Sequence, residues 1–241
     1  MESHLFRSSL VLAGSLIVCS VIGSWAALSV KGQEQTIAVT GSAKKHIKSD
    51  LVVWTTTVSR QAEKLADAYK PLALDIPVVK DYLVHKGIRK EEITVSSIAT
   101  QATHEKDNYG GEGGKITGYT LRQSIEVRSK DIDKVSAIAR EATELINKGI
   151  AIESSAPSYY CTTLGDIKIE MLAEAAKDAK IRAQKIATST GSTVGSLRSA
   201  KMGVLQITPA DSTQVSDQGI SDTSSIDKDI TAVVNLSFSL Q

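Results

Sequence analysis

The pattern of apolar and polar positions is clearest between Thr163 and Gly191, where it predicts a long helix. Apolar residues recur there at steps of three and four, which is the spacing of one helix face. The residues of this face are Ile169, Leu172, Ala176, Ala179, Ala183 and Ile186. Because half of them are alanine, we expect a sheet or a second helix to pack closely against this face.

Two further segments have helical spacing. The first runs from Ser59 to Gly87 and contains Pro71 and Pro77. Proline removes a backbone donor and clashes with the preceding turn, so we expect a kink or two helical pieces there. The second runs from Asp131 to Lys148 and is followed by glycine, a residue typical of the position after a helix C-terminus.

Segments rich in β-branched residues, or with alternating apolar and polar positions, predict strands. These segments are residues 36–39, 51–58, 93–103, 119–128, 150–161, 192–207 and 230–240. The first two are expected to pair, with a loop or a distortion at the polar segment between them, AKKHIKSD. The segment HEKDNYGGEGGKITG is expected to form a mobile hairpin loop, and the polar residues 208–229 a long loop or a partly disordered flap.

These elements follow one another in the order β-β-α-β-β-α-β-α-β-β. Strands in antiparallel pairs with helices packed on one face describe an α+β fold. Residues 32–241 are long enough to form one such domain with its own core. Residues 1–31 are expected to form a separate N-terminal segment.

That N-terminal segment contains a stretch without charge, Ser8–Val30. As a helix it would reach about 34 Å at about 1.5 Å per residue, enough to cross a hydrocarbon core of about 30 Å. We favour a transmembrane anchor over the alternative, a signal peptide cleaved near Ser24-Trp25-Ala26. Both interpretations place the rest of the chain on the far side of the inner membrane. It is anchored there if the segment is a transmembrane helix, and free in the periplasm if the segment is a cleaved signal peptide.

Several segments resemble the SIMPL-domain family of bacterial envelope proteins. The most extensive is AEAAKDAKIRAQKIATSTGSTVGSL, from Ala173 to Leu197. TIAVTGSAKKHIKSDLVVWTTTVS, GYTLRQSIEVRSKDIDKV and ITAVVNLSFSL agree with it. The resemblance implies an extracytoplasmic protein that assembles into oligomers and contributes to envelope integrity or oxidative-stress tolerance.

Charge and composition argue against a nucleic-acid partner. The chain has 28 basic and 27 acidic residues, and aromatic residues make up only 4% of it. It therefore offers neither a strongly basic face for phosphates nor the aromatic platforms on which bases stack.

The sequence contains no recognisable catalytic or metal-binding motif. The histidines, His4, His46, His85 and His104, do not show the spacing of metal ligands; we place His85 at a helix end and both His46 and His104 in loops. Cys19 lies in the apolar segment, and for Cys161 we favour a buried, inert thiol over an intermolecular one. The aspartates of the polar loop lack the regular spacing of a calcium site; they are Asp211, Asp217, Asp222, Asp227 and Asp229.

We therefore predict no catalytic, cofactor-binding or metal-binding residue. The leading hypothesis is a non-enzymatic, membrane-anchored scaffold that associates with itself. An alternative is a periplasmic small-molecule-binding module whose GGEGG and 208–229 loops close over a ligand of unknown identity. A hydrolase that uses Cys161 or His104 ranks last.

Overall fold

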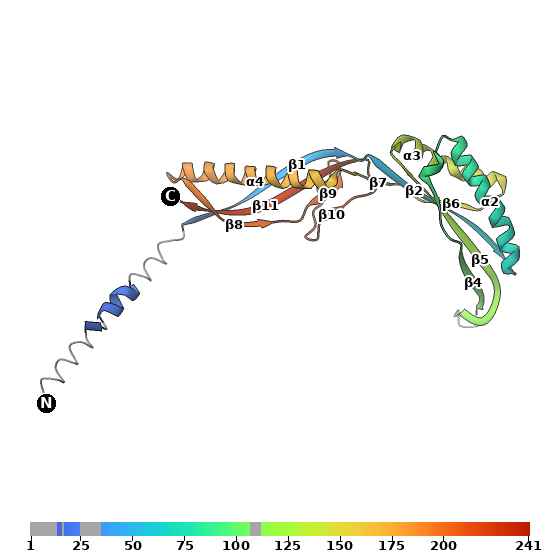
Figure 1. The fold of residues 1–241 in the computed structure, drawn as a ribbon, viewed down its shortest axis with the longest axis horizontal. Coiled ribbons are helices and arrows are strands. Elements are labelled where there is room, and N and C mark those ends of the chain that lie inside the picture. Colours follow the sequence, from blue (N-terminus) through green and yellow to red (C-terminus); the bar gives the residue numbers. More distant parts are fainter. Residues whose placement is uncertain (1–13, 16, 25–34, 107–111) are drawn as a thin grey trace, which may run out of the picture. The chain divides into compact units, whose positions relative to one another are not determined.

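A computed structural model describes residues 14–15, 17–24, 35–106 and 112–241, which form an α+β fold (Figure 1). Its contacts divide the chain into two compact units. Unit 1 contains the described residues up to Ala43, together with Leu172–Gly203 and Ala232–Gln241. Unit 2 contains Lys44–Met171 and Val204–Thr231.

Unit 2 contains a six-stranded antiparallel sheet, which we call sheet B. Its strands are β2 (Leu51–Ala62), β3 (Ile93–Val95), β4 (Ala99–Lys106), β5 (Glu112–Ser129), β6 (Ile152–Ser154) and β7 (Ser158–Tyr160). The long strands β2 and β5 pair along the centre of the sheet. β3 and β4 flank β5, and β6 and β7 flank β2.

Two helical segments of unit 2 cover the central strands and share one core with them. They are α2 (Leu65–His85) and α3 (Ile132–Glu141), which continues into the 3-10 helix η2 (Ala142–Lys148). Trp54, Leu72 and Ile125 are fully buried in this core, together with the other residues from these elements. The indole N–H of Trp54 donates to the Ser154 hydroxyl at 3.1 Å, so the ring is buried without an unpaired donor.

A second sheet, sheet A, has β11 at its centre. Its strands are β1 (Thr36–Lys48), β8 (Val194–Met202), β9 (Gln206–Pro209), β10 (Ile220–Ser221) and β11 (Asp227–Leu240). β1 lies on one side of β11, and β8 and β9 lie on the other. β8 and β9 are antiparallel to β11, whereas β10 is parallel to β9, which departs from the purely antiparallel sheets that we expected.

In unit 1, α4 (Leu164–Ser189, of which residues 172–189 belong here) packs on β1. The buried face of α4 is a ladder of residues at intervals of four: Met171, Ala175, Ala179, Ala183 and Ala187. A Cβ atom on Gly41 would collide with the backbone of Ala175 and Ala179. Strand β1 therefore approaches the helix closely only because residue 41 has no side chain.

The face predicted for this helix was partly wrong. Ala179 and Ala183 are buried as expected, but Ile169 is 71% exposed and Ile186 is 49% exposed. Small residues occur on several sides of α4, so hydrophobic spacing alone did not single out the side that the strand can approach most closely.

The predicted loop AKKHIKSD is largely strand. β1 continues through it to Lys48, with Ile47 buried and Lys44 and His46 facing outward. The expected pairing of β1 with β2 was also wrong, because these strands belong to different sheets. The glycine-rich hairpin is present between β4 and β5, but both strands extend into its predicted loop, and residues 107–111 lie outside the described part.

The helix with two prolines is a single element. It begins at Leu65 rather than Ser59, because β2 continues to Ala62, and it contains both Pro71 and Pro77. Each proline removes the partner of the carbonyl four residues earlier, at Asp67 and Ala73. Both of those residues are exposed, so water can satisfy their carbonyl groups.

Most of the predicted anchor Ser8–Val30 lies outside the described residues; residues 14, 15 and 17–24 of it are helical. Within the described part of the chain, no helix has the length and apolar character needed to cross a membrane. The order of elements agrees with the sequence prediction when β3–β4, β6–β7 and β8–β10 are each counted as one interrupted strand segment.

Candidate functional site

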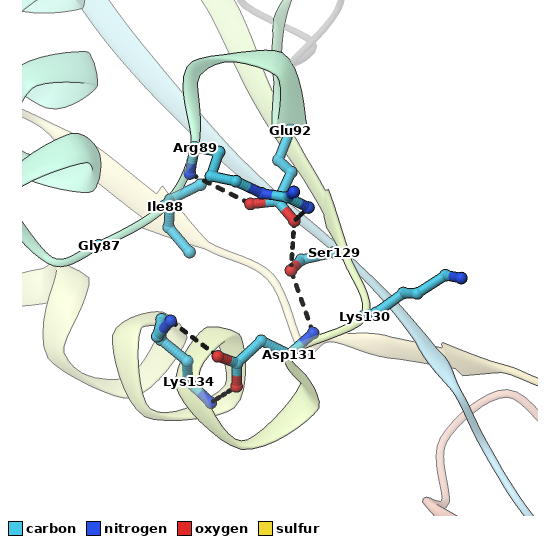
Figure 2. A pocket seen from close by; sticks show the side chains of 8 residues that line it. All are labelled: Gly87, Ile88, Arg89, Glu92, Ser129, Lys130, Asp131 and Lys134. Carbon is cyan, nitrogen blue, oxygen red and sulfur yellow. Dashed lines mark hydrogen bonds and ion pairs between the residues drawn. The ribbon is translucent and has the colours of Figure 1, made fainter.

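A charged pocket of about 270 Å³ lies in unit 2, where two turns meet (Figure 2). One turn connects α2 to β3, and the other connects β5 to α3. The pairing of Ile93 with Val127 joins β3 to β5 and so brings the two turns together. The pocket is lined by Gly87, Ile88, Arg89, Glu92, Ser129, Lys130, Asp131 and Lys134.

The first wall of the charged pocket follows the end of α2. Gly87 has a φ of +91°, a left-handed conformation that ends the helix and that residues with a Cβ rarely adopt. The Ile88 amide then donates to the Leu83 carbonyl at 3.0 Å, and the Ile88 side chain is buried beneath the turn. The chain leaves in extended conformation at Arg89, which places this side chain at the pocket.

Glu92 connects this wall to the opposite turn. One carboxylate oxygen accepts from the Arg89 guanidinium at 2.7 Å and from the Ser129 hydroxyl at 2.7 Å. The other accepts from the Arg89 amide at 3.1 Å. The guanidinium of Arg89, with further help from Ser129, lowers the pKa of Glu92 to about 2 against the opposing effect of burial. Glu92 is therefore ionised at neutral pH.

The second wall of the charged pocket is the start of α3. Asp131 is its N-cap and accepts from the Lys134 amide at 3.2 Å. The Lys134 ammonium lies 2.7 Å from the same carboxylate and lowers the pKa of Asp131. The Ser129 hydroxyl accepts from the Asp131 amide at 3.1 Å, which links the two walls.

The arrangement is suited to holding a small anion. Arg89 and Lys134 are each paired with a carboxylate of the lining, and Lys130, whose side chain extends away from the pocket (Figure 2), adds one positive charge nearby. The lining includes neither a histidine nor a cysteine, and Ser129 donates to a carboxylate that is ionised and already accepts other bonds. A serine nucleophile needs a base that takes its proton, and Glu92, with its low pKa, is a poor one.

A second polar cluster joins β1 to β11 within unit 2. The Asp229 carboxylate lies 2.8 Å from the Lys44 ammonium and 3.2 Å from Nδ1 of His46, and it accepts from the Asp211 amide at 2.9 Å. Lys44, followed by the backbone of Asp211, lowers the pKa of Asp229 to about 2. Asp227 lies 3.7 Å from the other ring nitrogen of His46.

The other residues considered for chemistry are dispersed. His85 ends α2 as predicted, with Nδ1 2.6 Å from the Asp81 carbonyl oxygen, whereas His46 and His104 lie in strands rather than loops. Cys161 is half-buried, with Sγ 3.4 Å from the Thr163 hydroxyl, and Cys19 is exposed. Among the described residues, no three His, Cys, Asp or Glu side chains are grouped to hold a metal ion. His4 lies outside the described residues.

The loop at 208–229 is held together by its own hydrogen bonds. Lys228 is almost completely buried and donates to the Asp222 carbonyl at 2.5 Å and to its carboxylate at 3.0 Å. Asp222 also accepts from the amides of Ser224 and Ser225. Neither this loop nor the described part of the GGEGG segment lines the charged pocket, so the two loops of the ligand-binding alternative do not close over it.

A different surface feature lies in unit 1, where sheet A has two edges. β8 pairs only with β11 among the described strands, and β1 ends the other side of the sheet. Every β8 residue from Ser196 to Met202 is exposed, including Leu197 at 53% and Met202 at 63%. These apolar side chains lie on a strand whose outer edge pairs with no other described strand.

Sequence reasoning missed the charged pocket because its residues look like ordinary helix ends. The sequence did place a helix end at Gly87 and a helix start at Asp131. It gave no sign that these ends meet, because β3, the strand that joins them, is only three residues long. Two signals were available in the sequence. Glu92 follows Arg89 by three residues, and Lys134 follows Asp131 by three residues.

Comparison with solved structures gives only distant likenesses. An amidase of the hydantoinase/carbamoylase family from Burkholderia phymatum is 10% identical, with a TM-score of 0.30, over 61% of this chain and 38% of that one. A putative amidohydrolase/peptidase from Burkholderia cenocepacia is 13% identical, with a TM-score of 0.25, over 56% and 33%. This chain thus spans well under half of either protein, and likenesses at these TM-scores support no statement about fold or function.

The regulatory subunit of aspartate kinase from Thermus thermophilus is 14% identical, with a TM-score of 0.18, over 81% of this chain and 88% of that one. No curated protein matches the chain. A family model does match, over residues 37–238, and it is described as SIMPL, a protein of unknown function (DUF541). This match extends over both units and confirms the resemblance seen in the sequence: the chain belongs to the SIMPL family.

Proposed function

We propose that this chain is a non-enzymatic scaffold of the cell envelope that assembles through the two edges of sheet A in unit 1. In this proposal the apolar segment Ser8–Val30 holds it at the inner membrane, and residues 32–241 lie outside the cytoplasm. The observation that carries the proposal is the exposed, unpaired edge of β8. Such an edge presents a row of backbone donors and acceptors that can pair with another strand.

The hydrogen bonds of β8 indicate which residues face outward. The Gly203 amide donates to the Val233 carbonyl, which lies on β11. Backbone groups of successive residues point to opposite sides of a strand, so the groups of Ala200 and Met202 point away from β11. These outward groups are the ones that a neighbouring strand would use.

Contacts between β1 and β11 likewise indicate which groups of β1 face outward. The Leu240 amide donates to the Gln35 carbonyl, and the Thr40 hydroxyl lies 2.7 Å from the Asn235 side-chain oxygen. These contacts run in opposite directions along the two strands, so β1 is antiparallel to β11. The backbone groups of Ala38 then point away from β11.

Charge favours pairing between β8 of one copy and β1 of the next. β8 contains Arg198 and Lys201 but no acidic residue, so two β8 strands side by side would place like charges near one another. Residues 36–43 of β1 contain no charged residue. Because β8 and β1 are different surfaces, the contact is head-to-tail and produces a closed ring or an open chain. In the envelope, such an assembly would contribute to integrity or oxidative-stress tolerance.

The proposal predicts that a proline on either edge prevents assembly. Ala200→Pro and Ala38→Pro each remove one outward N–H while leaving the bonds to β11 in place. We expect a discrete multimer for the wild-type full-length protein in detergent and a monomer for each variant. Light scattering corrected for bound detergent measures these masses, and intact mass spectrometry shows whether Met1–Val30 is retained.

A mixing experiment makes the test specific for head-to-tail pairing. Ala200→Pro keeps a free β1 edge and Ala38→Pro keeps a free β8 edge, so a mixture of the two should form a one-to-one dimer. Ala200→Ser retains the amide and should assemble like the wild type. A wild-type protein that stays monomeric at high concentration, or an unchanged mass for Ala200→Pro, would contradict the proposal.

A further inference from the structure

The charged pocket has features of a ligand site that assembly through sheet A does not explain. It lies in unit 2, it has a volume of about 270 Å³, and its charged side chains come from two turns that are distant in sequence. It is slightly smaller than the pockets of drug-sized ligands, which begin at about 300 Å³.

The cationic groups of the charged pocket lie on opposite walls. Arg89 and Glu92 form one wall and Lys134 and Asp131 the other, with the Ser129 hydroxyl between them (Figure 2). The Lys130 side chain extends away from this space. A ligand in the pocket would therefore meet Arg89 from one side and Lys134 from the other.

The two carboxylates do not prevent an anion from binding, because protein donors already compensate them. Glu92 accepts from the Arg89 amide, the Arg89 guanidinium and the Ser129 hydroxyl. Asp131 is bound by the amide and the ammonium of Lys134. The guanidinium carries five N–H donors and the ammonium three, so each cation has donors beyond the one directed at its carboxylate.

We propose that the charged pocket binds a small phosphoryl-bearing anion through Arg89 and Lys134. A planar carboxylate is satisfied by the fork of a single arginine, whereas a tetrahedral phosphoryl group presents oxygens in several directions and can reach cations on two walls. The volume exceeds what inorganic phosphate fills. A phosphate ester with a short polar chain uses the space better, with the buried Ile88 beneath it.

Equilibrium dialysis of the full-length protein in detergent tests this site. The two probes are radiolabelled inorganic phosphate and radiolabelled glycerol 3-phosphate, at fixed pH and ionic strength. We expect saturable binding of one anion per chain, and tighter binding of glycerol 3-phosphate if the ligand is an ester. Equal affinities for the two probes would identify free phosphate as the ligand and would also support the site.

Three substitutions that remove one positive charge separate the pocket from general electrostatics. Arg89→Gln and Lys134→Gln should each weaken binding about tenfold or more, because each removes charge-assisted hydrogen bonds. Lys130→Gln makes the same change in charge at a side chain that points away, and it should weaken binding by no more than about twofold at moderate salt.

Two results would contradict the proposal that this pocket binds an anion. One is an absence of saturable binding of either probe to the folded wild-type protein. The other is an equal loss of affinity in Lys130→Gln and Lys134→Gln, which would indicate attraction by overall charge. Lys134→Gln keeps the test valid if Arg89→Gln fails to fold, because Lys134 and Asp131 are both solvent-accessible, with side chains 42% and 48% exposed. Anion binding is tested independently of assembly, because the masses measured for Ala200→Pro and Ala38→Pro say nothing about this pocket.

Discussion

At the scale of single residues, Gly41 shows how one missing atom sets the contact between a strand and a helix. Its position faces the alanine ladder of α4, where a Cβ would enter the helix backbone at Ala175 and Ala179. The obstacle is backbone rather than a flexible side chain, so the helix itself would have to move. Residue 41 therefore accommodates no larger side chain while this packing is retained.

We predict that Gly41→Ala lowers the stability of the protein by about 2–3 kcal/mol, the upper range for overpacking a well-packed contact. Gly165→Ala is the matched control, because nothing lies within 4 Å of its added Cβ and it is in the first turn of α4. The control should be neutral or more stable by up to about 1 kcal/mol. Thermal unfolding followed by circular dichroism measures both, and an unchanged melting temperature for Gly41→Ala would refute the close contact.

Asp229 gives a prediction about acid stability. Lys44 holds its pKa at about 2, below the ordinary value of 3.8 that it regains on unfolding. A carboxylate with a lower pKa in the folded state stabilises the fold above its unfolded pKa, and that contribution disappears as pH falls from about 5 to about 2. Because Lys44 is 54% exposed, we expect solvent screening to limit the contribution to about 1 kcal/mol.

Asp229→Asn should therefore make the decrease in the free energy of unfolding between pH 5 and pH 2 less steep. Urea unfolding across that pH range measures this decrease. Asp217→Asn is a comparison at an exposed aspartate of the same region, and it should leave the slope as in the wild type. An Asp229→Asn slope identical to that of the wild type would show that Lys44 does not stabilise the ionised carboxylate.

At the scale of elements, alternation and helical spacing recovered the order of helices and strands, and they failed where partners distant in sequence decide the structure. The alternation that predicted a strand at 230–240 corresponds to β11, in which Ala232, Val234, Leu236 and Phe238 are buried. The polar run after Val39 resembled a loop because its partner Asp229 lies far along the chain. The buried side of α4 was mistaken in part because close approach, rather than hydrophobicity, selects it.

One buried lysine, Lys228, contributes to the order of the 208–229 loop. We predict that Lys228→Met, which keeps the apolar stem, leaves the Asp222 carboxylate without its ammonium partner and loosens residues 216–226. Hydrogen exchange of peptides from this loop should accelerate about tenfold or more. Lys180→Met, at an exposed position of α4, should leave their exchange unchanged. Equal protection in both variants would mean that the serine amides around Asp222 hold the loop by themselves.

At the scale of the whole molecule, the family and the fold class could be predicted from the sequence, and the charged pocket could not. Motifs spread along the chain pointed to the SIMPL family, and the family model confirms this. The pocket depends on the pairing of β3 with β5, which joins turns about forty residues apart. Each turn alone has the residues of an ordinary helix cap, so no local signal distinguishes it from other helix ends.

The central place of β11 in sheet A constrains the order in which the protein can fold during synthesis. The strands of sheet B all lie between Leu51 and Tyr160, so the ribosome delivers that sheet as one uninterrupted stretch. β11 is made after every other strand, yet β1, β8 and β9 all hydrogen-bond to it. At about 5–20 residues per second, β1 waits roughly 10–40 s and β8 roughly 2–8 s for their common partner, with their edges open to other chains. A chaperone that shields strand edges would have its greatest effect in that interval.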